Sequence, residues 1–73
     1  MTPEKLKDLM HKLDFTTADV ATVMGVTRRS VQHWLAGVTP IPLSTAIVLG
    51  AILDGLLPME WVEEKIIEEL RIA

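Results

Sequence analysis

Two short helices joined by a tight turn, between residues 16 and 37, most constrain how this chain can fold. Thr16 is a suitable N-cap for the first helix, and Asp19 stands three residues later, at the spacing of a capping box. Gly25 supplies the left-handed conformation that lets a chain leave a helix sharply, and Thr27 follows as the N-cap of the next helix. The pattern predicts a helix-turn-helix.

The second helix of this pair, over residues 28–35, has two different sides. At 100° per residue its apolar side chains fall together, and these are Val31, Trp34 and Leu35. The opposite side carries a mostly polar group made of Arg29, Gln32, His33 and Ala36. We therefore expect one side to be anchored in a core and the other to face a partner.

Three more helices are predicted around this pair. Thr2 and Pro3 suit the start of a first helix, whose apolar residues recur at helical spacing: Leu6, Leu9, Met10 and Leu13. Residues 38–42, VTPIP, cannot continue a helix, and residues 43–54 are apolar nearly all round and end at Gly55. A last helix follows from Pro58 over residues 58–72. The expected fold is all-α, a single compact domain of five helices over residues 1–73.

The last predicted helix has two apolar sides. One carries Met59, Val62, Ile66, Leu70 and Ala73, with Ile67 at its margin, and Trp61 and Ile72 lie roughly opposite. A domain of this size buries only about 60% of the surface that its unfolded chain exposes, so a second copy is the simplest cover for the second side. The predicted dimer contacts are Trp61, Val62, Ile66, Ile67 and Leu70, with the surface of helix 43–54 as a further candidate. Alternatively, both sides fold back on the chain's own core.

Charge is unevenly distributed along the chain, whose net charge is −3. The first 40 residues hold five Lys and Arg against four Asp and Glu, and the remainder holds two against six. A front half that faces a polyanion would produce this asymmetry, and so would a solvated acidic helix at the back. The glutamates at positions 63, 64, 68 and 69 are interpreted as such a solvated face.

Several classes of function are disfavoured by the residues that are present. There is no cysteine, which argues against disulfides, thiolate nucleophiles and cysteine-based zinc sites, and His33 has only His11 as a histidine companion. No nucleophile or acid–base constellation is recognisable, so we do not expect an enzyme, a cofactor, a metal or a small-molecule ligand. The longest apolar run, residues 46–53, is far below the roughly 20 residues of a membrane span. A cytoplasmic protein without a membrane partner is expected.

The segment from Thr17 to about Leu53 resembles the Cro/C1-type (XRE) helix-turn-helix family of phage and bacterial repressors. The residues that carry the resemblance are Thr17, Ala21, Gly25, Thr27, Val31, Trp34 and Gly37, followed by a proline-containing loop and an apolar helix that begins near Ser44. The Pro-Ile-Pro after this pattern is similar to small phage regulators of the anti-CRISPR-associated (Aca-like) kind. The resemblance implies a lambda-repressor-like domain and a transcriptional regulator, a repressor that binds an inverted-repeat operator in double-stranded DNA as a homodimer.

The resemblance also implies which residues meet DNA. It places Arg28, Arg29, Gln32 and His33 in the major groove, and Thr16, Thr17, Thr27, Ser30 and Thr39 at the DNA backbone. Arginine can pair with guanine and glutamine with adenine, and each such pair discriminates by about 1–3 kcal/mol. Two merely solvated arginines are the alternative, but positive charge at a helix start opposes the helix dipole.

The recognition helix has few basic neighbours, which is a departure from many members of the family. Ala36, Val38 and Thr39 stand where relatives often carry amide or basic side chains, so each subunit neutralises few phosphates. We therefore expect modest affinity per subunit and a shallow salt dependence. The rival hypothesis is an antitoxin-like or adaptor domain, in which the acidic and apolar C-terminal helix binds a different protein.

Overall fold

Five α-helices make up the computed structural model, which describes the backbone of residues 1–72 and the side chains of residues 1–70, with no strand in that range. They are α1 (Pro3–Leu13), α2 (Thr17–Met24), α3 (Arg28–Leu35), α4 (Leu43–Leu53) and α5 (Met59–Ile72). The predicted all-α fold, with its helix-turn-helix at the second and third helices, is confirmed.

Two predicted helix boundaries were wrong by one residue. Asp54 caps α4 instead of continuing it, and Pro58 precedes α5 instead of beginning it. The Pro58 carbonyl accepts the first backbone hydrogen bond of α5, from the Val62 amide at 3.1 Å, as the residue before a helix does. The predicted positions of Ala73 and of the Ile72 side chain lie outside the described residues.

The first four helices all end in the same hydrogen-bonded turn. In each, an amide just past the helix donates to a carbonyl five residues earlier: Phe15 to Met10 (2.8 Å), Val26 to Ala21 (3.0 Å), Val38 to His33 (2.9 Å) and Leu56 to Ala51 (2.9 Å). The residue before that amide has a positive φ, and it is glycine in three cases and Asp14, with φ 56°, in the first. Four local turns therefore reverse the chain sharply without help from distant residues.

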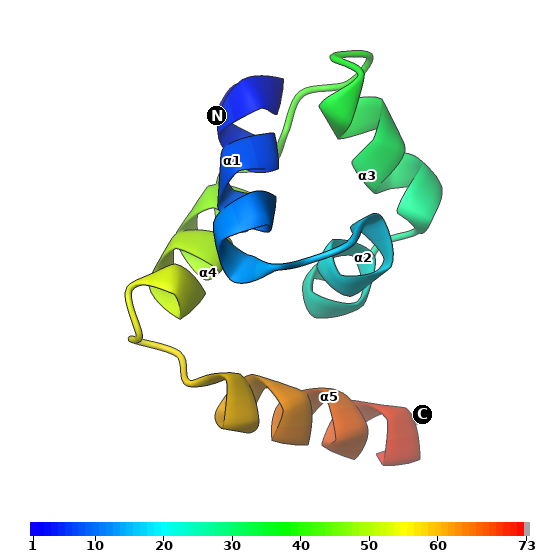
Figure 1. The fold of residues 1–73 in the computed structure, drawn as a ribbon. Coiled ribbons are helices and arrows are strands. Elements are labelled where there is room, and N and C mark those ends of the chain that lie inside the picture. The colour runs from blue at the N-terminus through cyan, green and yellow to red at the C-terminus, as the bar shows by residue number, and fades with distance from the viewer. Residues whose placement is uncertain (73) are drawn as a thin grey trace.

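The core is formed almost entirely by the first four helices. α1 packs against α3 and α4, and α2 packs against α3, so that the four helices surround one set of apolar side chains (Figure 1). The buried apolar side chains are Leu6, Leu9, Val20, Ala21, Val31, Trp34, Leu49, Ile52 and Val62. Within residues 59–70, α5 contributes one of these nine, Val62, and its main contact is with α2.

α4 carries no charged side chain, but it is only half covered. Thr45, Leu49 and Ile52 are buried, whereas Leu43 and Ile47 are 75% and 62% exposed. The Thr45 hydroxyl has no hydrogen-bond partner among the described residues. None of the helices in the described part of the chain is both long enough and apolar enough to span a membrane.

Candidate nucleic-acid interface

The start of α2 is held by a reciprocal cap. The Thr16 hydroxyl accepts a hydrogen bond from the Asp19 amide at 3.2 Å, and the Asp19 carboxylate accepts one from the Thr16 amide at 2.9 Å. This is the predicted capping box, and it satisfies two amides that a helix start would otherwise leave without partners. The first turn of α2 is thereby defined by residues three apart in the sequence.

The turn between α2 and α3 contains three residues, Gly25 to Thr27. Gly25 adopts φ 68°, where a side chain would be strained, and the Val26 amide closes the turn onto Ala21. Thr27 then caps α3, because its hydroxyl accepts the Ser30 amide at 3.1 Å. The predictions for both turn residues are therefore confirmed: Gly25 ends α2 and Thr27 caps α3. Together they determine how α3 leaves α2.

One side of α3 is anchored in the core. Val31 is fully buried and Trp34 is 6% exposed, and α3 packs against both α1 and α2. Leu35 is half-buried and packs against the same core. The predicted inner side is confirmed, and its two strong anchors determine which side of this eight-residue helix faces outward.

The predicted base-contacting residues lie on or beside the outer side of α3. Arg28, Arg29 and Gln32 are exposed, and His33 is half-buried. Within residues 1–70 the ion pairs are Lys12 with Asp8 (3.0 Å) and Lys65 with Glu68 (3.3 Å), so no described carboxylate neutralises either arginine. The first turn of α3 also carries no acid. Two guanidinium groups and the positive end of the helix dipole therefore combine at one place, which favours an anionic partner.

The residues predicted to meet the DNA backbone are not equally accessible. Thr16, Thr27 and Thr39 are exposed, whereas Thr17 and Ser30 are half-buried. The hydroxyls of Thr16 and Thr27 accept backbone amides as caps, but a hydroxyl that accepts can still donate its own proton to a phosphate oxygen. Thr27 and Ser30 also lie 3.1 Å apart, hydroxyl to hydroxyl, so the pair keeps one proton free to donate outward. Capping and phosphate contact are thus compatible here.

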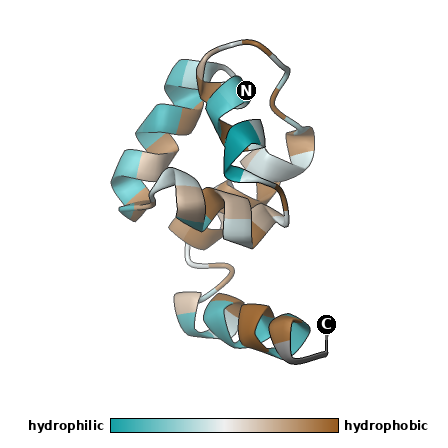
Figure 2. Ribbon diagram, turned by 90° about the vertical axis from the view of Figure 1, so that its right-hand side faces the viewer, coloured by the Kyte–Doolittle hydropathy of each residue, from teal (hydrophilic) through white to brown (hydrophobic). Residues whose placement is uncertain are grey.

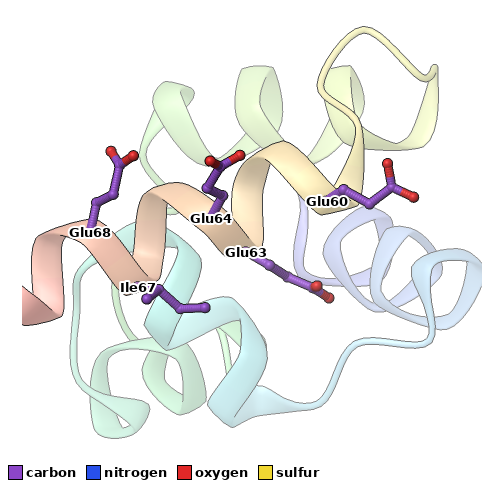
Figure 3. A pocket seen from close by; sticks show the side chains of 5 residues that line it. All are labelled: Glu60, Glu63, Glu64, Ile67 and Glu68. Carbon is purple, nitrogen blue, oxygen red and sulfur yellow. The ribbon is translucent and has the colours of Figure 1, made fainter.

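Five of the ten acidic residues lie on α5, away from these arginines along the chain. Glu60, Glu63, Glu64 and Glu68 surround Ile67 on a shallow, open depression of the α5 surface (Figure 3). In the described residues no three His, Asp or Glu side chains come together in a way that could hold a metal ion. The acidic face therefore has the character of a solvated helix surface, and it is the wrong sign for a nucleic acid.

The residues predicted as dimer contacts fall into three environments. Val62 is 7% exposed and Ile66 is half-buried, and both pack on the chain's own core. Ile67, 50% exposed, lies among the glutamates. Trp61 and Leu70, 47% and 72% exposed, line an open groove of about 750 Å³ between α5 and the end of α2.

That groove includes residues that the sequence did not single out. Met24 and Val26, from the end of α2 and its turn, line it together with Val48 of α4 and Leu57. Met24 and Val26 are separated from α5 by more than 30 residues along the chain, so no periodicity could have associated them with it. The one indication of this groove in the sequence was Val26, an apolar residue at a turn position, which the structure shows to be exposed.

Comparison with known proteins gives one informative similarity. A Pyrococcus furiosus protein that carries the provisional name of HTH-type transcriptional regulatory protein is 35% identical over 51 residues, which is 70% of this chain. The matched segment is 16% of that protein, so this chain spans a small part of its length. No family model matches the chain. No solved structure matches it either. The name of this relative agrees with the helix-turn-helix arrangement of α2 and α3.

Proposed function

We propose that this chain is a sequence-specific regulator of transcription that reads double-stranded DNA with the outer side of α3. The observation that carries the proposal is the exposure of Arg28, Arg29 and Gln32, without described carboxylate partners, on a helix whose other side is buried. The regulator role named for the Pyrococcus furiosus relative supports it. The finer assignment to the Cro/C1-type (XRE) family, and within it to Aca-like repressors, is part of the same proposal.

The side chains suit base recognition as well as phosphate contact. Arg29 and Gln32 stand three positions apart on the helix and so share one side of it. Each presents a planar group that can make two parallel hydrogen bonds to a purine edge in the major groove. Arg28, at the first position of α3, can reach a base or a phosphate. We assign Thr16, Thr17, Thr27, Ser30 and Thr39 to the DNA backbone, and His33 to a base contact at the edge of the site.

A homodimer on an inverted repeat would compensate for the small number of cationic side chains. α5 lies to one side of the body formed by α1–α4 in two perpendicular views, and in Figure 1 it runs along the bottom of the molecule, with α2 between it and α3. In the proposed dimer a second copy pairs through α5, and each copy presents its α3 to one half-site of the same DNA. Half-sites about one helical turn apart would suit such a dimer.

The α5 residues most suited to this dimer contact are Trp61 and Leu70, which both line the groove. Val62 and Ile66 are engaged with their own core, and pairing around Ile67 would bring the glutamates of two copies together (Figure 3). Like charges in contact are destabilising. Trp61 and Leu70 instead line an apolar groove that a second copy could cover.

Selection of binding sequences from a random duplex pool tests the proposal most directly. The expected result is enrichment of an inverted repeat whose half-sites contain a guanine and an adenine at neighbouring positions. Enrichment of a single half-site would contradict the dimer but keep α3 as the reader. The absence of any enrichment would overturn the DNA-binding proposal.

A protein-interaction role is the second candidate function. The exposed apolar groove beside Trp61 and Leu70 favours it, since exposed apolar patches often mark protein contacts. In that case α5 would hold a different protein, as an antitoxin-like or adaptor domain does. Failure to enrich any duplex would favour this alternative.

A further inference from the structure

Few apolar contacts attach α5 to the rest of the molecule. Of its side chains within residues 59–70, Val62 is buried and Ile66 is half-buried, while every other one is exposed. Its main neighbour, α2, has eight residues and is about 12 Å long, whereas α5 has fourteen and is about 21 Å long. α2 can therefore support only part of the length of α5. Leu70, which shares a side with Val62 and Ile66, is exposed at the open groove between α5 and the end of α2.

The polar contacts of α5 do not tie it to the other helices. The Lys65 ammonium pairs with Glu68 at 3.3 Å and lies 5.6 Å from the centre of the Trp61 ring, and both contacts are within α5. No side-chain hydrogen bond or ion pair joins residues 59–70 to α1–α4 in the described part of the chain. An open groove of about 750 Å³ separates part of α5 from the end of α2, so the packing there is incomplete.

The body formed by α1–α4 is closed by its own interactions. It contains eight of the nine buried apolar side chains, and each of its helices ends in a local hydrogen-bonded turn. The last of these turns, at Gly55, finishes α4 before α5 begins, and the link to α5 is a short segment in which Leu56 is 75% exposed. In Figure 2 this link is the visible connection between α5 and the body above it.

We propose that α5 opens from α1–α4 as a separate unit, hinged at residues 55–58, while α1–α4 remain folded. Regions with few buried apolar contacts open at lower free-energy cost than the core, and they often do so as one cooperative element. The opened form uncovers Val62, Ile66 and the end of α2, and it leaves α3 held by Val31 and Trp34. The inference does not rest on the proposed function, because it makes no use of DNA binding.

Amide hydrogen exchange on the full chain tests the proposal, at a concentration where light scattering reports the monomer mass. The probes are amides inside α5, such as Ile66, and amides inside α1, such as Met10. If α5 opens as a separate unit, its amides should be protected from exchange at least about 10-fold less than those of α1. The decisive comparison is Leu9→Ala, which destabilises α1–α4 alone and should lower protection in α1 at least about 30-fold while changing α5 by less than about twofold. An equal loss in both helices would show a single cooperative unit and overturn the proposal.

Two further measurements keep the test decisive if Leu9→Ala does not fold. Leu9→Val is the milder variant and should show the same separation with smaller changes. In the unsubstituted chain, exchange in α5 should respond weakly to low urea and exchange in α1 strongly, since a local opening exposes little surface. Equal urea dependence in the two helices would also overturn the proposal.

Discussion

α3 and α5 both expose charged side chains on an amphipathic helix, but they are attached to the molecule in very different ways. α3 has eight residues and two strong anchors, Val31 and Trp34, and it begins and ends in hydrogen-bonded turns. α5 has fourteen residues and one buried anchor among those described, Val62. A helix that must present side chains at defined positions needs the first kind of attachment. The second kind suits an element that can move or exchange partners.

The largest expected difference between the two helices is in their anchors. Trp34→Ala should lower the free energy of unfolding by about 3–5 kcal/mol, which is close to the whole stability of so small a domain. Val62→Ala, at the corresponding anchor of α5, should cost about 1–2 kcal/mol, because fewer buried methyl groups are lost in an open site. Urea unfolding followed by circular dichroism compares them, and equal losses would contradict the contrast between the helices.

The charged faces of the two helices should differ in their effect on DNA binding. Arg29→Ala should weaken binding to the selected sequence by about 1–3 kcal/mol. It should also reduce the slope of log affinity against log salt concentration by about one, because one cation is lost. Arg29→Lys should restore the salt slope but not the preference at the contacted base, since lysine lacks the planar two-donor group. Titrations at several salt concentrations measure both quantities.

Glu64→Gln, on the acidic face of α5 away from the groove, is the matched control for a change of one charge. It should leave DNA affinity within about twofold under the same conditions, because α5 is not placed at the DNA. If Arg29→Ala behaved like this control, the side of α3 assigned to the groove would be wrong.

The two exposed edges of α5 should differ in their effect on association. Leu70→Asp, at the groove, should raise the dimer dissociation constant at least about 10-fold, because it places a charge in an apolar contact. Ile67→Asp, within the acidic face, should leave the dissociation constant unchanged or nearly so. Light scattering over a range of concentrations measures the mass, and the reverse ranking would move the dimer contact to the outer face of α5.

The smallest predicted effect is a gain in stability within α1–α4. Thr45→Val replaces a fully buried hydroxyl that has no described hydrogen-bond partner by a methyl group of similar size, and it should raise the free energy of unfolding by about 1 kcal/mol. Exchange of α5 amides should not change, because the gain belongs to the body of four helices. A parallel gain in the protection of α5 amides would instead show that α5 and α1–α4 unfold together.

Much of the α2–α3 segment could be predicted because its determinants are local. Thr16 with Asp19, Gly25, and Thr27 with Ser30 act through hydrogen bonds that span three to five residues, so their roles depend little on the rest of the chain. The outer side of α3 followed from helical periodicity. The left-handed turn at Asp14 was not foreseen, because a non-glycine residue there carries a weak signal.

The sequence by itself therefore determined the five helices, the N-caps of α1, α2 and α3, and the two sides of α3. Only the tertiary structure decided how α5 is used. Val62, Ile66 and Leu70 share one helical side, yet two of them pack inward, whereas Leu70 is exposed at the groove between α5 and the end of α2. This groove, which Met24 and Val26 also line, joins residues far apart in the sequence. Such contacts depend on where whole helices lie in space, which local patterns do not specify.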